Sequence, residues 1–201
     1  LAEEQARRVL CELAEALVYL HSCSIVHRDI KSQNVLLSAP QLDHATVKLC
    51  DFGFSRFVDD GDVLASHPCT PATASPEVLS QRAYDSKSEV WSLGVLFYEC
   101  VFGRSPFAGA GSREQLHAMQ RRVRDDPDRF WEELLRGASP HCQALLRDML
   151  QYEPARRIAL RDIFRRPFVT VYTIADAVNG LEYSLNVLNA HDLRNMGDVK
   201  R

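Results

Sequence analysis

Two short polar runs carry side chains of the kinds that bind metals, move protons and neutralise phosphates. The first is His27-Arg28-Asp29-Ile30-Lys31-Ser32-Gln33-Asn34, and the second is Asp51-Phe52-Gly53. Carboxylate and amide oxygens are the ligands that Mg²⁺ prefers. A carboxylate beside a hydroxyl can orient it and accept its proton, and a lysine ammonium acts on a phosphate as a point charge. The elements on either side must bring these runs together.

A third run, Ser75-Pro76-Glu77, follows the other two along the chain. A match to three residues is weak alone, but the runs in this order form a specific pattern. With them the sequence resembles the eukaryotic protein kinase family over about residues 1–169. Lys31, two residues after Asp29, is similar to the serine/threonine class, and Val47-Lys48-Leu49-Cys50 is similar to the calmodulin-dependent and protein-kinase-D-like branch. The resemblance implies transfer of the ATP γ-phosphate to serine or threonine hydroxyls of proteins.

The resemblance gives five side chains a role in catalysis or nucleotide binding. Asp29 is expected to orient the substrate hydroxyl and accept its proton, and Lys31 to stabilise the γ-phosphate. Asn34 and Asp51 are expected to bind the nucleotide and its Mg²⁺, because magnesium takes few protein ligands and completes its shell with phosphates and water. Leu36 matches the residue beneath the adenine ring. The implied cofactors are ATP and Mg²⁺.

The segment after Asp51 is expected to control the site. Thr70 matches a hydroxyl that steadies Asp29, and we hypothesise that an upstream kinase phosphorylates Ser66. Arg28 supports that hypothesis, because a guanidinium at this position of the family can clamp an added phosphate. The expected partners are protein substrates and this upstream kinase.

Other matches are expected to support the fold. Glu77 is expected to form a buried ion pair with Arg157 that ties this segment to the late helices. Glu89 stands where aspartate is usual, at a position that caps the backbone of the catalytic loop, and its extra methylene puts the rigidity of that loop in question. Three more departures from the family pattern lie in the segment after Asp51. Cys69 stands where glycine is usual, Thr73 where tyrosine is usual and Ser75 where alanine is usual.

Apolar periodicity predicts the elements that position these runs. Residues 1–22 predict an amphipathic helix, and residues 88–101, apolar on every side, predict a central buried helix. The short apolar runs 35–37 and 47–50 predict a β-hairpin, and residues 51–76 a long loop. Further helices are expected over 113–123, 139–150 and 160–165. The predicted fold class is mainly α, the C-terminal lobe of the protein kinase fold, a helical bundle around a buried helix with a short β-hairpin carrying the catalytic and metal loops.

Composition excludes several other classes of protein. The 24 basic and 27 acidic residues among 201 give a net charge of −3, which argues against a nucleic-acid partner. No run of about 18 uncharged apolar residues is present, so we expect no membrane span. The six cysteines include no Cys-x-x-Cys pair, which favours reduced thiols and an intracellular, cytoplasmic protein.

Residues 170–201 form a separate tail in this interpretation, after a kinase domain over residues 1–169. An apolar seam from Ile174 to Leu188 predicts an amphipathic helix packed on its own domain. The alternative is a tail that docks in the substrate groove as an inhibitor. No glycine-rich loop or strand lysine precedes Leu1, so we expect the chain alone to be inactive.

A scaffold that uses a kinase lobe to bind partner helices is the second functional hypothesis. A scaffold has no physical need for the intact set of Asp29, Lys31, Asn34 and Asp51, which favours the enzyme. Single residues also have simpler interpretations. We favour a packed role for His27, a half-exposed position for Trp131, and a solvated helix face for the basic run Arg121, Arg122 and Arg124. Cys50 either lines the nucleotide pocket or is an inert buried thiol.

Overall fold

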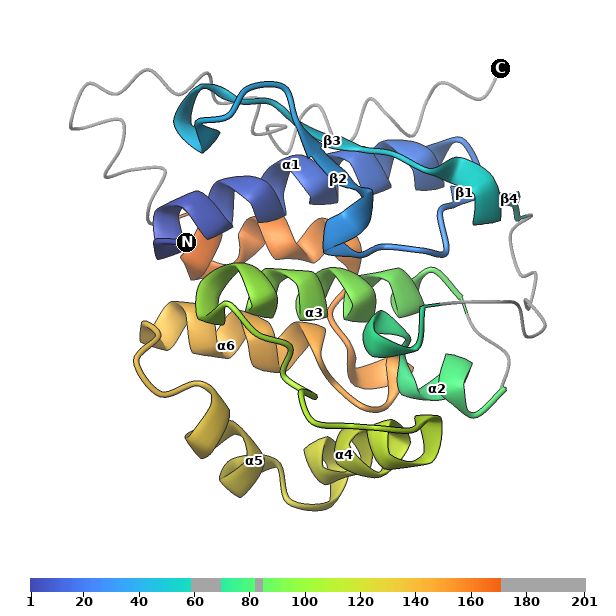
Figure 1. The fold of residues 1–201 in the computed structure, drawn as a ribbon, viewed down its shortest axis with the longest axis vertical. Helices are drawn as coiled ribbons and strands as arrows, with labels where there is room; N and C mark the ends of the chain where they lie inside the picture. Colours follow the sequence, from blue (N-terminus) through green and yellow to red (C-terminus); the bar gives the residue numbers. More distant parts are fainter. Residues whose placement is uncertain (59–69, 82–84, 171–201) are drawn as a thin grey trace.

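The computed structural model describes residues 1–58, 70–81 and 85–170. Within these ranges helices dominate and the strands are confined to two small antiparallel sheets (Figure 1), which confirms the mainly α prediction. Ser66, Cys69 and the predicted tail helix with its seam lie outside the described residues. None of the described helices has the length and apolar character needed to cross a membrane.

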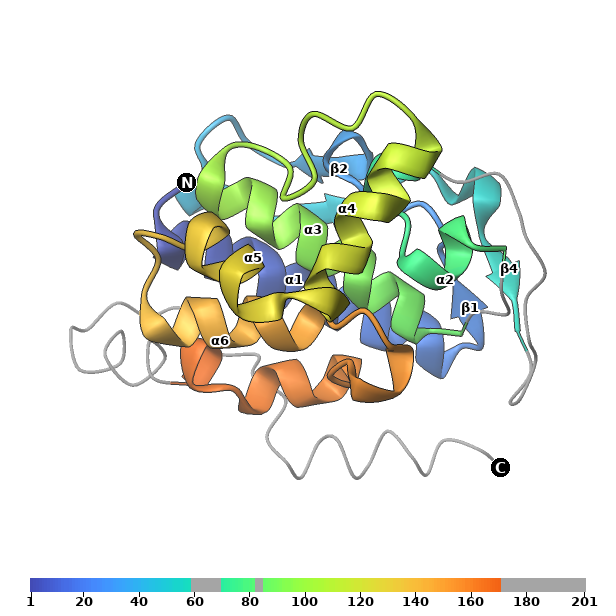
Figure 2. The ribbon, with the colours of Figure 1, turned by 90° about the horizontal axis from the view of Figure 1, so that it is seen from below.

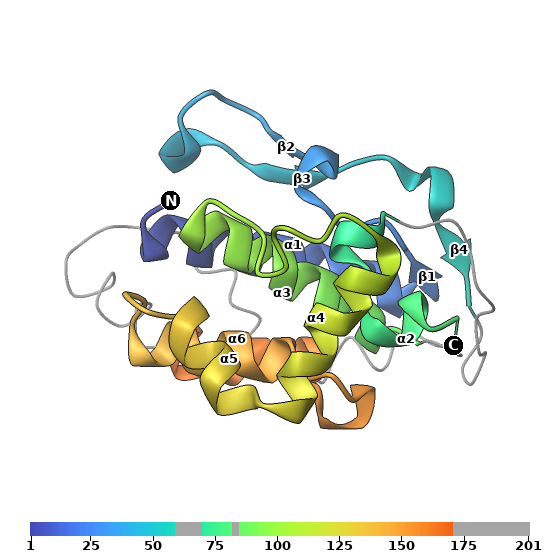
Figure 3. The ribbon, with the colours of Figure 1, turned by 60° about the horizontal axis from the view of Figure 1, so that its bottom comes forward.

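The central helix is α3 (Lys87–Phe102), and it is buried as predicted. Apolar side chains from Val90 to Tyr98 are at most 2% exposed, and the helix lies between α1 (Glu3–Ser22) and α6 (Pro140–Met149) (Figures 1 and 3). Gly94 allows the close approach of α6, because a Cβ there would lie 3.0 Å from Met149 Cβ. Gly103 ends α3 with φ at 70°, a left-handed conformation that favours glycine. The core is therefore built around this helix.

Helix α1 covers α3 with one apolar face. Its buried residues recur at steps of three and four, from Ala6 to Leu20, and Glu3 and Glu4 lie in the first turn, where acidic groups favour the helix dipole. The helix predicted for 160–165 is present as the 3₁₀ helix η6 (Leu160–Arg165), which packs against α1. These contacts fix the end of α1, and the first polar run begins at His27, after the two-residue strand that follows this helix.

The lower layer contains α2 (Pro76–Leu79), α4 (Arg113–Asp125) and α5 (Pro127–Leu134) (Figure 2). Helix α5 is absent from the sequence prediction, because it is only two turns long and begins at Pro127, directly after α4. The half-exposed position predicted for Trp131 is wrong: its side chain is 1% exposed and packs edge-on against Phe130 with ring centroids 4.8 Å apart. Trp131 is part of the core.

Two short sheets hold the polar runs, one above α1 and the other beside its C-terminal end (Figure 3). The predicted hairpin is present: β2 (Val35–Leu37) pairs antiparallel with β3 (Val47–Leu49). A second pair, β1 (Ile25–Val26) with β4 (Arg56–Phe57), was not predicted, since strands of two residues carry no alternation signal. The described parts of the predicted loop form β4 and two 3₁₀ turns, η3 (Phe52–Phe54) and η4 (Pro71–Thr73), and α2 begins at its last residue. The remaining 3₁₀ turns are η1 (Ser32–Asn34), η2 (Leu42–His44) and η5 (Pro154–Arg156).

Candidate active site

The first polar run, residues 27–34, forms a loop between β1 and β2 that is anchored by the first turn of α3. Arg28 has φ at 71°, a conformation that is unfavourable for a residue with a side chain. Glu89 Oε1 accepts a hydrogen bond from the Arg28 backbone N at 2.7 Å and holds the loop in this conformation. The other carboxylate oxygen, Oε2, lies 2.6 Å from His21 Nε2 at the end of α1. The longer glutamate therefore reaches two partners at once.

The Asp29 carboxylate lies at the centre of the site and is 2% exposed. Lys31 Nζ is 2.6 Å from its Oδ2, and Thr70 Oγ1 donates to its Oδ1 at 2.7 Å. Lys31 Nζ also donates to Thr70 Oγ1 at 2.9 Å, which closes a triangle of contacts. Burial alone would raise the pKa of Asp29, but the hydrogen bonds from Lys31, Thr70 and Asn34 outweigh burial and lower it. The carboxylate is therefore charged at neutral pH.

Asn34 connects this carboxylate to the hairpin. Its Nδ2 donates to Asp29 Oδ2 at 3.0 Å and to the Asp29 carbonyl at 2.8 Å, which leaves the amide oxygen as the atom that could bind a cation. The Asn34 carbonyl accepts from Cys50 N at 2.9 Å. The antiparallel register thus brings Asn34 and Asp51 to the same end of the hairpin.

Asp51 is exposed and has a left-handed backbone with φ at 62°. Its Oδ1 accepts a hydrogen bond from Gly53 N at 3.2 Å, and a Cβ at position 53 would lie 3.1 Å from that oxygen. The described residues contain no group of three or more His, Cys, Asp or Glu side chains that could hold a metal. One carboxylate and one amide oxygen fit Mg²⁺, which completes its shell with phosphates and water.

His27 and Cys50 support this arrangement from inside. His27 is fully buried, its Nε2 lies 3.0 Å from the Cys50 carbonyl oxygen, and its ring packs edge-on against Phe52 with centroids 5.0 Å apart. The packed role that the sequence favoured for His27 is confirmed. Cys50 Sγ donates to the Asn34 carbonyl at 3.3 Å, so this thiol faces the loop backbone.

Leu36 and Arg28 occupy the edges of the site. Leu36 follows Asn34 by two residues on β2 and is 54% exposed, which leaves its side chain accessible to a flat apolar ligand. The Arg28 Nε donates to the Phe54 carbonyl oxygen, which ties the catalytic loop to η3. Neither placement tests the role that the resemblance assigns.

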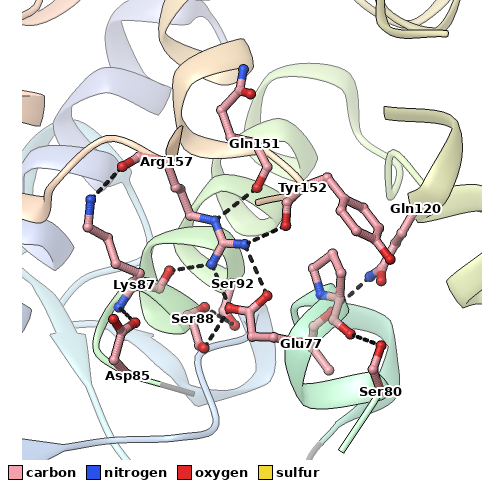
Figure 4. A network of polar contacts seen from close by, with 12 residues as sticks. Glu77, Ser80, Asp85, Lys87, Ser88, Ser92, Gln120, Gln151, Tyr152 and Arg157 are labelled. Atoms are coloured by element: carbon pink, nitrogen blue, oxygen red, sulfur yellow. Dashed lines mark hydrogen bonds and ion pairs between the residues drawn. The ribbon is translucent and has the colours of Figure 1, made fainter. Parts of the chain in front are cut away.

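The structure places Glu77 and Arg157 in the ion pair expected from the sequence (Figure 4). Arg157 Nη1 and Nη2 donate to Glu77 Oε1 and Oε2 at 2.8 and 3.1 Å, and the Arg157 side chain is fully buried. Ser88 Oγ donates to the same carboxylate at 2.8 Å. Burial would raise the pKa of Glu77, but Arg157 and Ser88 lower it below the ordinary value. The guanidinium also lies 5.2 Å from the Trp91 ring centroid.

His21 and Ser88 are the supporting residues that sequence reasoning missed. Each acts on a carboxylate that is distant in sequence, His21 on Glu89 and Ser88 on Glu77. Neither has a spacing that indicates its partner, because the contacts depend on how α1 and α2 pack against the start of α3. Only knowledge of that packing could have identified them.

Comparison with known proteins agrees with this geometry. The model of the protein kinase domain matches residues 1–169. The chain is 38% identical over 170 residues to the serine/threonine-protein kinase ULK3 of Homo sapiens and 39% identical over 170 residues to the serine/threonine-protein kinase fused of Drosophila melanogaster. It is also 35% identical over 176 residues to the serine/threonine-protein kinase unc-51 of Caenorhabditis elegans.

These matches cover 84 to 85% of the chain but 34%, 20% and 20% of the three relatives. The chain thus spans about a third or less of their length. None of the three names mentions calmodulin or protein kinase D, so the finer placement in that branch stays a prediction.

Proposed function

The chain belongs to the protein kinase family, and from this premise we propose that the protein is a serine/threonine kinase with Asp29 as its catalytic base. The observation that carries the proposal is the triangle of Asp29, Lys31 and Thr70, in which a buried carboxylate is held charged by an amine and a hydroxyl. Members of this family use ATP and Mg²⁺ and act on proteins. The sequence-predicted domain of residues 1–169, with a tail over 170–201, belongs to the same proposal.

Asp29 and Lys31 divide the chemistry between them in this proposal. A charged carboxylate can accept a hydrogen bond from the incoming serine or threonine hydroxyl, orient its oxygen and take its proton. Lys31 lies close enough to Asp29 to place a positive charge beside the γ-phosphate that the oxygen attacks. Phosphoryl transfer requires little covalent work from a protein, so the rate depends on this positioning.

Asn34 and Asp51 are proposed to hold Mg²⁺ through one amide and one carboxylate oxygen, and Leu36 to lie under the adenine ring. When bound, Mg²⁺ would neutralise charge on the phosphates of ATP. The support is chemical: both donors are hard oxygens, both come from one end of the hairpin, and Asn34 is already fixed by Asp29. Asn34 also links the proposed metal site to the base, so the two would be positioned together.

The decisive experiment compares the full-length protein with its Asp29→Asn variant in Mg-ATP-dependent peptide phosphorylation. Loss of a catalytic base lowers the rate by about 100-fold to 10,000-fold, so activity should nearly vanish. Asp128→Asn is the matched control, because the Asp128 side chain is fully exposed and remote in sequence from the polar runs. Equal rates for wild type and Asp29→Asn would refute the proposal.

Regulation and location complete the proposal. We expect an upstream kinase to phosphorylate Ser66, the tail to affect substrate access, and the protein to act inside the cell. Mass spectrometry of active protein tests the first point, since the absence of phosphate between Asp51 and Thr70 contradicts it. Truncation after Val169 tests the second, because removal of an inhibitory tail raises the activity of the full-length protein and removal of a merely packed tail does not.

A further inference from the structure

Ser75 directly precedes α2, in the position of a capping residue, but its side chain does not cap the helix. Residues that precede a helix commonly accept a hydrogen bond from its first turn. Ser112 Oγ accepts such a bond from Gln115 N and Ser139 Oγ accepts one from Cys142 N, both at 3.2 Å. The Ser75 hydroxyl makes no such bond. Ser75 is 1% exposed, and its Oγ has no hydrogen-bond partner among the described residues. A buried hydroxyl without a partner costs about 1–3 kcal/mol, so this one requires an explanation.

The residues around Ser75 line a small cavity that is partly open to solvent. It lies where the loop that carries Asp29, the segment before α2 and the start of α3 meet. Its volume, counted as the space that the centre of a water molecule can occupy, is about 20 Å³. One water needs about 10–15 Å³ by the same measure and two to four polar partners. The polar residues that line it are Arg28, Thr70, Thr73, Ser75, Ser88, Glu89 and Ser92.

Several of these groups keep hydrogen-bonding capacity. Ser92 Oγ donates to the Thr73 carbonyl at 2.8 Å and retains its lone pairs. The Glu89 carboxylate accepts from Arg28 N and contacts His21, and each oxygen can accept once more. The cavity is also lined by three of the four departures from the family pattern, namely Thr73, Ser75 and Glu89. These three departures therefore occur together around one cavity, whose lining also includes the apolar residues Val26, Ile30, Ala74 and Val78.

We propose that this cavity is a binding site for one ordered water molecule, held by Ser75 Oγ and by polar groups of the catalytic loop and α3. The water connects the beginning of α2 to the Glu89 carboxylate that anchors Arg28. Alanine at position 75 would remove one of its partners and weaken this connection. The inference does not rest on the kinase activity, and its tests measure structure, stability and exchange.

The direct test is a crystal structure of the full chain at a resolution that orders internal water. We expect a density peak within hydrogen-bond distance of Ser75 Oγ and of a second polar atom of the cavity. A Ser75 hydroxyl with no water beside it, or one bonded to a protein atom, overturns the proposal. This measurement uses the unmodified protein and so does not depend on whether a variant folds.

The second test is the sign of the stability change in Ser75→Ala. A hydroxyl bonded to water contributes to stability, so we expect the variant to unfold at lower urea, with its folding equilibrium constant reduced several-fold. An unpartnered hydroxyl has the opposite effect, because its removal relieves a buried polar group and raises the unfolding midpoint. A raised midpoint therefore contradicts the proposal.

Amide exchange tests the connection to the loop. Ser75→Ala should speed hydrogen exchange of the Arg28 amide, which donates to Glu89, relative to wild type. Ser80→Ala is the matched control: Ser80 Oγ lies at the other end of α2, bonds the Pro76 carbonyl at 2.7 Å and does not line the cavity. Unchanged Arg28 exchange in Ser75→Ala, or equal acceleration in both variants, overturns the coupling.

Discussion

At the scale of single residues, the state of Asp29 is set by opposing effects of known sign. Burial favours the neutral acid, whereas Lys31, Thr70 and Asn34 each stabilise the carboxylate. The depressed pKa of Asp29 means that the charged form is present throughout the neutral range and is lost only in acid. Thr70 contacts both Asp29 and Lys31, so its hydroxyl should matter to both.

We predict that Thr70→Val lowers kcat of the full-length protein by about 10-fold to 100-fold, the loss expected for one hydrogen bond to a charged group. Because Thr70 lowers the pKa of Asp29, the acid limb of the pH profile should move to higher pH in the variant. Thr70→Ser keeps the hydroxyl and should restore both properties. A pH profile identical to wild type would show that Thr70 does not act on Asp29.

At the scale of elements, the Glu77–Arg157 pair joins α2 to the chain after α6, and its removal should cost stability before activity. Glu77→Gln leaves the fully buried Arg157 without a counter-charge, which destabilises by about 3–5 kcal/mol. Urea unfolding followed by circular dichroism measures this loss. The exposed Glu132→Gln, on α5, is the control and should change the midpoint little.

The same pair predicts a pH dependence. Glu77 has a lowered pKa when folded, so the stability from the pair is fully present above its ordinary value of 4.5 and is lost as the pH falls through the folded value. Wild type should therefore lose stability below about pH 4.5 more steeply than Glu77→Gln, which has no carboxyl to protonate. Parallel curves for the two proteins would contradict this assignment.

Gly94 gives a prediction about helix packing. In an isolated helix, alanine is better than glycine by about 1 kcal/mol. Here the added Cβ would lie 3.0 Å from Met149 Cβ and 3.1 Å from Leu150 Cδ2, so α3 and α6 must separate. We predict that Gly94→Ala destabilises by about 1–3 kcal/mol and that the larger Gly94→Ser loses more. A raised unfolding midpoint for Gly94→Ala would show that α6 can move aside at little cost.

The basic run of α4 shows how element packing changes the interpretation of a charge pattern. The sequence favoured a solvated face, but Arg122 lies 5.7 Å from the Phe130 ring centroid and Arg124 lies 5.0 Å from that of Tyr152. Arg124 also pairs with Asp125. These side chains remain exposed while their guanidinium groups cover aromatic rings, so the face is partly structural.

At the scale of the whole molecule, exposed apolar side chains are concentrated in one stretch of the chain. Among the described residues, five of the seven large apolar residues that are exposed lie between residues 36 and 57: Leu36, Leu37, Phe52, Phe54 and Phe57. Such surfaces favour association when nothing covers them. We predict that the 201-residue chain self-associates and that Leu37→Ser with Phe57→Ser reduces this in sedimentation velocity. The exposed Tyr19→Ser, outside the stretch, is the control.

Much of the fold could be predicted from the sequence, because the long helices have strong apolar periodicity and the α3 segment is apolar on every side. The short elements could not: β1 and β4 have two residues each, and α5 is a two-turn helix adjoining α4. For the site, the polar runs identified Asp29, Asn34 and Asp51, which lie close along the chain or across the hairpin. The contacts of His21 with Glu89 and of Ser88 with Glu77 arise only when distant helices pack.

Ser88 and Glu89 are neighbours in the first turn of α3, yet one holds the beginning of α2 and the other holds the catalytic loop. Successive side chains of a helix point about 100° apart, so helix geometry alone fixes the directions of these two contacts relative to each other. Inserting or deleting one residue within α3 directly after Glu89 would rotate both side chains by about 100° relative to the buried part of the helix, and both contacts would be lost together. The position of the loop that carries Asp29 relative to α2 is thus set by two consecutive residues of a buried helix.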